Sequence, residues 1–465
     1  MSAPTRARRA ALAARVAAPV LLVSNGPRAR NLPMNQVPFR ADSTFLYFTG
    51  VTEPGAAALI DTDGSCTLFL DPPADDDALW HGEVDTFAAR QARYDVDAIR
   101  PLAELDAACA ALRGRLLTLA VPDTAMTARA AALTGHDLAY PRTPGPDVLV
   151  DAVIGLRRTR DAWEMERMRE AAALAARAHV AAMTATRPGL HERHVAALFD
   201  AVIAAEGATN SYQSIVTVRG EVLHNHGYDN RLEAGQLLLL DGGAETRSGH
   251  ASDVTRTWPV NGRFDARQRD AYQLVLAANE ACIEKVRAGV RYRDIHWEAL
   301  RVLAQGLVDL GLLRGASVDT LVESGAVAAF FPHGVGHLLG MDVHDLENFG
   351  DRPAYAPGRT RPAQFGYRYL RLDLDLEPGM VVTIEPGFYV VPAILRDPEL
   401  RARLGAHVDF DAAEGWIGFG GIRIEDDILV TDGAPENLTA SIPKTVAELE
   451  ALVGSGPSAA ERLAP

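Results

Sequence analysis

The segment PHGVGHLLGMDVHD, residues 332–345, constrains this chain more than any other, because it places three histidines among three glycines. The histidines are His333, His337 and His344. Glycine permits the close backbone approach and the positive φ angles that a loop needs to curl around an ion. A tight turn that carries a few core histidines is the simpler alternative when this segment is taken alone.

Four carboxylates stand beside apolar runs that have the pattern of buried strands. They are Asp241, Asp253, Glu385 and Glu425. Because side chains alternate along a strand, we expect Thr255 on the face of Asp253 and Arg423 on the face of Glu425. A charge at the end of an apolar strand is costly to bury unless it is paired or binds a metal. One such residue is commonly a satisfied strand-end carboxylate, but four of them together with the histidine segment indicate a metal site.

The residue types also suggest which metal is bound. Four carboxylates and one imidazole are more donors than one ion needs, and they suit two divalent ions that share some of the carboxylates. An oxygen-rich site with a single nitrogen donor favours Mn, whereas affinity alone would favour Co or Zn. Two such ions lower the pKa of a shared water, so the chemistry that we expect is hydrolysis.

The five residues of this set, in their order and in their motifs, resemble the ligands of the pita-bread (creatinase/aminopeptidase-like) metallopeptidases: Asp241, Asp253, His337, Glu385 and Glu425. Within that fold the chain is similar to the proline-specific branch, aminopeptidase P and prolidase. PFRADSTFLYFTGVTEPG, residues 38–55, is similar to the N-terminal domain of that branch. The motifs YQSIVTVRGEVLHNH, DVTRTWPVNGRF, LEPGMVVTIEPGFY and GGIRIEDDILVT are similar to its catalytic domain.

This resemblance implies a role for each ligand. Asp241 would bind one ion, and Asp253 and Glu425 would bridge both. His337 and Glu385 would complete the shell of the second ion. Glu385 would also take up a proton and deliver it to the leaving imino nitrogen, as a general acid and base.

The resemblance also implies roles for residues around the ions. His224 would close over the substrate, and His344 would stabilise the scissile carbonyl as it becomes an oxyanion. His333 would shape the proline pocket. Arg423 and Thr255 would orient the ligands as their hydrogen-bonding partners.

Two features favour a prolidase, an Xaa-Pro dipeptidase, over an aminopeptidase P that acts on longer peptides. Glu385 and Glu425 are 40 positions apart, which leaves a long insertion between them. Arg371 falls where prolidases keep an arginine for the free carboxylate of a dipeptide, a geometry that suits the guanidinium fork. A surface arginine is the alternative for Arg371. Aminopeptidase P is the alternative activity, and a non-catalytic pita-bread binding module or a phosphotriester hydrolase are further alternatives.

One departure from the family pattern concerns the two aspartates. Asp241 and Asp253 are 12 positions apart, one more than in many family members. The extra residue falls in TRSGHAS, where a glycine-containing hairpin loop can absorb it.

The chain is long enough for two domains. We expect an α/β N-terminal domain of the aminopeptidase P type over residues 1–155, with strands at 16–24, 57–60 and 66–70. An α+β pita-bread catalytic domain is expected over 156–452. Its helices are expected near 160–186, 191–206, 265–288 and 291–310. The tail, 453–465, is expected to be disordered.

Charge and cysteine content limit the partners. The net charge of −15 argues against nucleic acid and anionic membranes. The resemblance implies proline-containing di- and oligopeptides as partners. Three cysteines without CxxC spacing indicate a reducing compartment, and no apolar stretch approaches the ~18–20 residues of a membrane span. We therefore predict a cytoplasmic protein, and the resemblance implies a homodimer or higher homo-oligomer.

Overall fold

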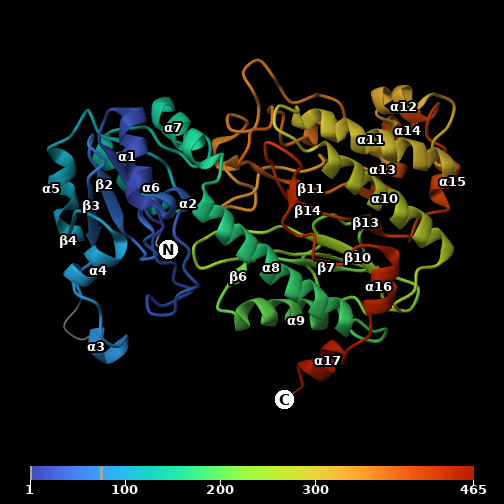
Figure 1. Cartoon of the computed structure of the whole chain (residues 1–465), viewed down its shortest axis with the longest axis horizontal. Helices are drawn as coiled ribbons and strands as arrows, with labels where there is room; N and C mark the ends of the chain where they lie inside the picture. The colour runs from blue at the N-terminus through green and yellow to red at the C-terminus, as the bar shows by residue number, and fades with distance from the viewer. Residues whose placement is uncertain (1–2, 74–76, 465) are drawn as a thin grey trace. The chain divides into compact units, whose positions relative to one another are not determined.

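The computed structural model describes residues 3–73 and 77–464. The chain forms two compact units (Figure 1). The N-terminal unit comprises the residues up to Arg158 together with Leu346–Pro353, and the C-terminal unit comprises Thr159–Asp345 together with the chain from Ala354 onward.

A five-stranded mixed sheet forms the centre of the N-terminal unit, in the order β4-β3-β2-β1-β5. Its strands are β1 (Val20–Val23), β2 (Ala57–Ile60), β3 (Cys66–Leu70), β4 (Ala98–Pro101) and β5 (Leu117–Thr118). The helices of this unit are α1 (Thr5–Val16), α2 (Ser43–Thr49), α3 (Asp77–Trp80), α4 (Phe87–Tyr94), α5 (Leu105–Ala110), α6 (Thr124–Thr134) and α7 (Asp147–Arg157). The strand that we expected from residue 16 begins only at Val20, because Val16 ends α1 and Ala17 takes a left-handed conformation, φ 53°.

Four long helices support the C-terminal unit, and all four agree with the expected ranges. They are α8 (Ala162–Ala185), α9 (Glu192–Ala205), α10 (Ala266–Lys285) and α11 (Tyr292–Asp309). Asp161 and Glu164 form a capping box at the start of α8, and Asp265 and Gln268 form one at α10, which explains where these helices begin. Figure 1 shows the strands of this unit between the α8–α9 pair and the α10–α11 pair.

The strands of the C-terminal unit pair antiparallel in several small sheets, as an α+β fold requires. The sheet orders are β10-β8-β7, β11-β14-β15, β12-β13 and β6-β9. The strands are β6 (Thr209–Asn210), β7 (Ile215–Thr217), β8 (Leu237–Asp241), β9 (Ala244–Glu245), β10 (Thr255–Pro259), β11 (Val381–Ile384), β12 (Gly387–Tyr389), β13 (Gly421–Arg423), β14 (Asp426–Leu429) and β15 (Glu436–Asn437). Most of their apolar side chains and those of the four helices form one large core, while Met165, Met168, Val381 and Leu429 belong to a smaller second cluster.

The remaining helices are short. They are α12 (Val318–Ser324), α13 (Pro392–Leu395), α14 (Pro398–Leu404), α15 (Phe410–Glu414), α16 (Val446–Leu452) and α17 (Ala459–Arg462). Single 3₁₀ turns occupy Leu102–Glu104, Ala326–Ala329, Glu347–Phe349 and Tyr367–Tyr369. The insertion between the two site glutamates therefore contains three helices, α13 to α15.

The C-terminal tail differs from the expected disorder, because α17 forms within it. Ser458 caps this helix, and the Arg462 guanidinium donates to Thr184 Oγ1 at 2.9 Å, which holds the tail against α8. Among the described residues, no helix is long and apolar enough to cross a membrane.

Candidate metal centre

Asp241 and Asp253 meet where a β-hairpin ends. Asp241 is the last residue of β8, and Asp253 lies two residues before β10, whose Thr255 pairs with Asp241. The turn between them closes with bonds from Thr246 N to His250 O (3.0 Å) and from Ser252 N to Ala244 O (3.0 Å). The extra residue of this turn therefore leaves the two aspartates side by side.

The two glutamates lie where strands end. Glu385 directly follows β11, and Glu425 lies between β13 and β14. The single strand that we expected through GGIRIEDD is interrupted there, because β13 pairs with β12 whereas β14 pairs with β11. At this interruption the Glu425 amide donates to Thr255 O at 3.0 Å, which brings Glu425 beside the aspartate hairpin.

The donor atoms form overlapping groups. Three groups of side chains each have one donor atom within 4.8 Å of the others: Asp241, Asp253 and Glu425; His337, Glu385 and Glu425; and Asp253, His337 and His344. The first two groups contain all five residues of the expected ligand set and share Glu425. This arrangement is what two neighbouring cation positions with a common bridging carboxylate require.

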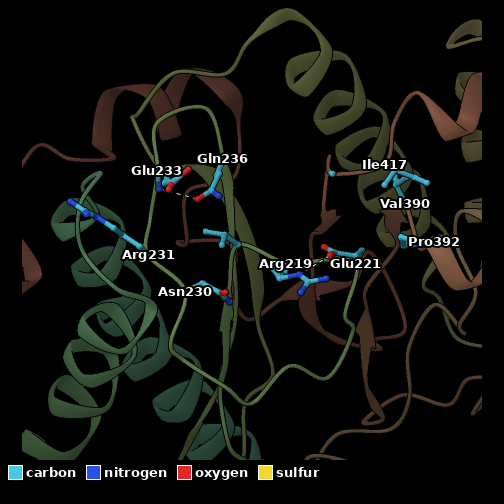
Figure 2. Close-up of a pocket in the computed structure, with 11 residues that line it drawn as sticks. Arg219, Glu221, Asn230, Arg231, Glu233, Gln236, Val390, Pro392 and Ile417 are labelled. Atoms are coloured by element: carbon cyan, nitrogen blue, oxygen red, sulfur yellow. Dashed lines mark hydrogen bonds and ion pairs between the residues drawn. The ribbon is translucent and has the colours of Figure 1, made fainter.

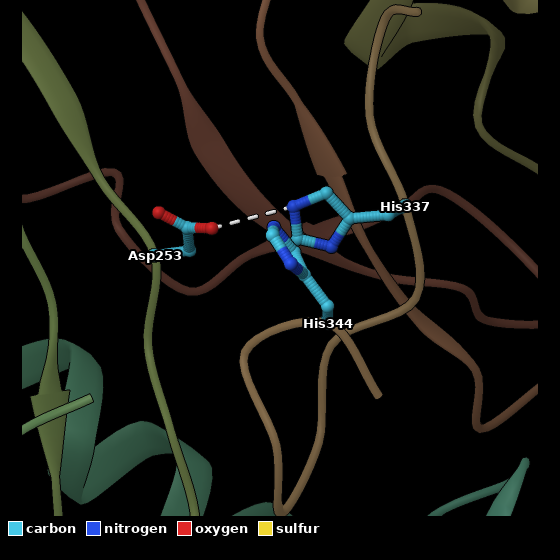
Figure 3. A group of neighbouring side chains, drawn as sticks. All are labelled: Asp253, His337 and His344. Carbon is cyan, nitrogen blue, oxygen red and sulfur yellow. Dashed lines mark ion pairs between the residues drawn. The ribbon is translucent and has the colours of Figure 1, made fainter. Parts of the chain in front are cut away.

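The backbone of the glycine-rich loop fixes the direction of His337. Its Nδ1 lies 3.0 Å from Leu338 O, so Nε2 faces Asp253 Oδ2 at 3.3 Å and Glu385 Oε1 at 3.9 Å. Gly336 has φ +153°, and a Cβ there would collide with Thr383 and the Tyr292 hydroxyl, so glycine is required. The exposed His344 ring stands edge-on to His337 with the centroids 4.5 Å apart (Figure 3).

Hydrogen bonds hold the carboxylates in place. The Arg423 guanidinium donates to Asp241 Oδ2 at 2.5 Å and to Thr255 Oγ1 at 3.0 Å, and the Thr255 hydroxyl donates to Glu425 Oε2 at 2.7 Å. The Arg423 and Thr255 side chains therefore both contact carboxylates of the expected ligand set. Arg423 contacts Asp241 directly and reaches Glu425 only through Thr255.

Sequence reasoning missed three residues that contact this centre. The Tyr212 hydroxyl lies 2.5 Å from both Asp241 Oδ1 and Asp253 Oδ1. Asp427 accepts from the Asp253 amide at 3.1 Å, and the Tyr389 hydroxyl lies 2.9 Å from both Arg423 Nη1 and His333 Nε2. Tyr212 and Tyr389 stand inside the quoted motifs YQSIVTV and EPGFY, and their position in those motifs was the available signal.

Burial and crowding change the acidity of the centre. Burial raises the pKa of Glu385 to about 7 and, together with the charge of Asp253, raises the pKa of Glu425 well above its usual range. Burial also raises the pKa of Asp241. Burial is the largest single effect on the pKa of Asp253 and raises it, but the hydrogen bond and charge of His337 and the hydrogen bond from Tyr212 together outweigh burial and lower this pKa. Buried carboxylates that repel one another in this way are a donor set that fits divalent cations.

The residues expected to contact substrate lie around the same centre. His333 Nδ1 is 3.6 Å from Glu385 Oε2, and the ring stands edge-on to Phe331. His224 lies on the loop after β7, and its side chain is exposed. Partial desolvation of the imidazole, and then the charge of Arg423, lower the pKa of His224. The charge of Arg371 acts in the same direction on the pKa of His224 and of His344, so Arg371 lies within electrostatic reach of both.

Comparison with known proteins identifies the family. Residues 166–432 match metallopeptidase family M24, and residues 5–117 match the N-terminal domain of aminopeptidase P. The chain therefore belongs to metallopeptidase family M24 and is a metallo-exopeptidase of the pita-bread fold.

Several relatives that match most of this chain carry the name of one branch of the family. The chain is 35% identical over 434 residues to a probable Xaa-Pro aminopeptidase of Aspergillus clavatus, a match that covers 90% of this chain and 88% of the relative. The structure of aminopeptidase PepP from Pseudomonas aeruginosa matches with a TM-score of 0.80 and 32% identity, over 96% of this chain and 97% of that one. Zinc-substituted aminopeptidase P of Escherichia coli in complex with product matches with a TM-score of 0.79 and 29% identity, over 96% and 97%. These relatives are named aminopeptidases, so they favour the alternative activity over the dipeptidase that we predicted.

Proposed function

We propose that this chain is an Xaa-Pro aminopeptidase that works with two divalent ions, with Mn favoured over Co or Zn. The observation that carries the proposal is the pair of donor groups that share Glu425. Asp241 and the bridging Asp253 and Glu425 would hold one ion, and His337 and Glu385 would complete the shell of the other. When bound, two such ions supply a water of lowered pKa and polarise a carbonyl oxygen.

The side chains of the protein would provide the proton transfers and the orientation. Glu385 would take up a proton from the attacking water and pass it to the leaving imino nitrogen, as a general acid and base. His344 and His224 would donate to the carbonyl oxygen as negative charge develops on it. His333, fixed by the Tyr389 hydroxyl and packed against Phe331, would form a wall of the proline pocket.

Metal dependence tests the ligand assignment. The metal-free protein should be inactive on Ala-Pro-Yaa peptides and should regain activity with Mn. Glu425→Gln and Asp253→Asn should each bind fewer ions and lose turnover, because each carboxylate would serve both ions. Wild-type turnover by a verified metal-free sample, or by either variant, would contradict the proposed centre.

A dipeptidase is the second candidate, because Arg371 lies within electrostatic reach of His224 and His344 and the insertion forms α13 to α15. We expect kcat/KM to be higher for Ala-Pro-Yaa than for Ala-Pro. If the dipeptide is preferred and Arg371→Ala raises KM for Ala-Pro alone, the dipeptidase assignment replaces the aminopeptidase. Arg368→Ala is the matched control, because this exposed arginine stacks over Tyr369 instead.

Two further expectations stay predictions. The cytoplasmic location is in keeping with three free, buried cysteines, Cys66, Cys109 and Cys282. The homo-oligomeric state rests on the family resemblance, and sedimentation of the purified protein would test it.

A further inference from the structure

A single buried carboxylate joins both ends of the loop that carries His224. Glu192, the first residue of α9, has no exposed surface. Its Oε1 accepts from the Val218 amide at 2.8 Å, and its Oε2 accepts from the Asn230 amide at 3.0 Å. The Asn230 side-chain amide lies 3.0 Å from both oxygens. We call residues 218–230 the His224 loop, and Glu192 contacts its first residue and its last.

Other contacts of the His224 loop to the rest of the chain lie near its second stem, where the Tyr228 hydroxyl donates to Ser214 O and the Arg193 amide donates to Tyr228 O at 3.1 Å. Closer to the tip the contacts are local. Asn225 Nδ2 donates to Thr217 Oγ1 at 3.0 Å, and the Gly227 amide donates to Asn225 Oδ1 at 3.1 Å. The tip is largely open to solvent, since Val222, His224 and His226 are all exposed. The position of the tip therefore depends on how firmly the two stems are held.

One side of the stems has little packing support. A pocket of about 480 Å³ opens there, and Val218 and Asn230 line it together with Val390 and Ile417 from the two ends of the insertion (Figure 2). The insertion touches the first stem at Gly220, where a Cβ would collide with the Gly421 backbone. It leaves the pocket beside the stems unfilled, and the hydrogen bonds to Glu192 join the two stems directly.

The bonding of Glu192 makes this clamp strong. In the described part of the chain Glu192 has no ion-pair partner, so amide N–H groups of the stems compensate its buried charge. Hydrogen bonds to an ionised carboxylate are roughly twice as strong as neutral ones. A buried carboxylate that loses such donors carries a large desolvation cost, so the stems cannot separate without exposing or stranding the charge.

We propose that Glu192 is a positioning residue for catalysis: it fixes both stems of the His224 loop and thereby places the His224 imidazole over the substrate carbonyl. This inference rests on the role proposed above for His224. Glu192 does not touch the substrate or the ions, and it acts only through the loop. Its loss should therefore reduce turnover while the metal centre stays intact.

The test combines kinetics with a double-mutant cycle. Glu192→Gln replaces one acceptor oxygen with an NH₂ group that faces the N–H of a stem, so the clamp should loosen. We therefore expect kcat on Ala-Pro-Yaa to fall by about 10- to 100-fold, with an unchanged Mn content. In a His224→Ala background the same substitution should cost less than about 2-fold, because it acts through the residue already removed. If the kcat losses of the two single variants multiply in the double variant, or if Glu192→Gln loses Mn, the proposal is overturned.

A second variant and a control separate positioning from general destabilisation. Asn230→Ala removes only the side-chain part of the clamp, so it should fold even if Glu192→Gln does not, and it should show the same non-additivity with His224→Ala. Asp123→Asn is the matched control, because Asp123 also accepts from backbone amides, those of Gly26, Ala125 and Met126, but lies in the N-terminal unit. It should leave kcat unchanged.

Hydrogen exchange gives a readout that does not depend on activity. Exchange in residues 218–230 should accelerate in Glu192→Gln and Asn230→Ala but not in Asp123→Asn. Faster exchange with unchanged kcat would overturn the positioning role although the clamp exists. An inactive wild type, or His224→Ala with full activity, would instead show that the proposed function or the role of His224 has failed.

Discussion

The two aspartates of the metal centre share one hydroxyl, that of Tyr212. This hydroxyl lies 2.5 Å from an oxygen of each carboxylate, and Tyr212 sits only a few residues before β7 in the chain. Partners of this kind orient metal-binding carboxylates, and their loss typically reduces metal affinity or activity by about 10- to 100-fold. Arg423 supports Asp241 from its other oxygen, so Asp253 depends more on Tyr212.

We therefore expect Tyr212→Phe to weaken Mn binding by about 10-fold or more, with a matching loss of activity at low Mn that high Mn partly restores. The measurement is a titration of the metal-free protein with Mn. Tyr94→Phe removes a hydroxyl that contacts Glu53 in the N-terminal unit, and it should leave the titration unchanged. Equal Mn affinity for Tyr212→Phe and the wild type would contradict the prediction.

His337 and His344 both stand close to Asp253, but we expect different roles for them. His344→Ala should keep its ions while kcat falls by about 10²–10³, the usual effect of losing one donor to an oxyanion. His337→Ala should lose metal, because its Nε2 faces Asp253 and Glu385. Metal analysis of both variants decides the matter, and loss of an ion from His344→Ala would make His344 a ligand.

Sequence reasoning at the residue scale identified side chains by their local setting. Asp241 and Glu385 could be recognised because a carboxylate at the end of an apolar strand is unusual. Asp427 could not, since an acidic residue in a strand is common, and only the position of Tyr212 in a family motif marked it. Their contacts with residues about 30 to 170 positions away exist only after folding.

At the scale of elements, a buried ion pair holds the loop that carries His344. Arg160 and Asp345 are almost fully buried and bind each other, and the Arg160 guanidinium also donates to Leu339 O at 2.8 Å. Gly340 lies against this pair so closely that a Cβ would collide with the Arg160 guanidinium. The loop between His337 and Asp345 is therefore built around the pair.

Arg160→Met should destabilise the C-terminal unit by about 3–5 kcal/mol, the usual cost of removing one partner of a buried pair. Chemical denaturation measures this change. Arg352→Met is the matched control, because Arg352 pairs with Asp147 and Asp151, which are exposed, and its loss should cost about 1 kcal/mol or less. Equal costs for the two variants would contradict the role of burial.

Helices were easier to predict than strands. The start of α8 is marked by Asp161 and Glu164, a local signal that the sequence displays directly. The break between β13 and β14 has no such signal, because it depends on the pairing of β13 with β12 and of β14 with β11. Val16 was assigned to a strand for a similar reason, since an apolar run alone does not show where a helix ends.

At the scale of the whole molecule, metal binding should stabilise one unit and leave the other unchanged. All five proposed ligands lie in the C-terminal unit, where the two bound ions would neutralise carboxylates that otherwise repel one another. An ion that binds only the folded state, at a free concentration of about 100 times its Kd, adds about 2.7 kcal/mol to the free energy of unfolding. Amides of β8, β10, β11 and β14 that exchange only through unfolding of this unit should therefore exchange about 100-fold more slowly with Mn than without it.

Amides of β1, β2 and β3 in the N-terminal unit serve as the internal reference, and their exchange rates should not change. Hydrogen exchange read by mass spectrometry measures both sets in one sample, and the Glu425→Gln variant should lose the protection. Equal protection of the two units, or none in the ligand-bearing strands, would show that the ions do not bind where these five side chains meet.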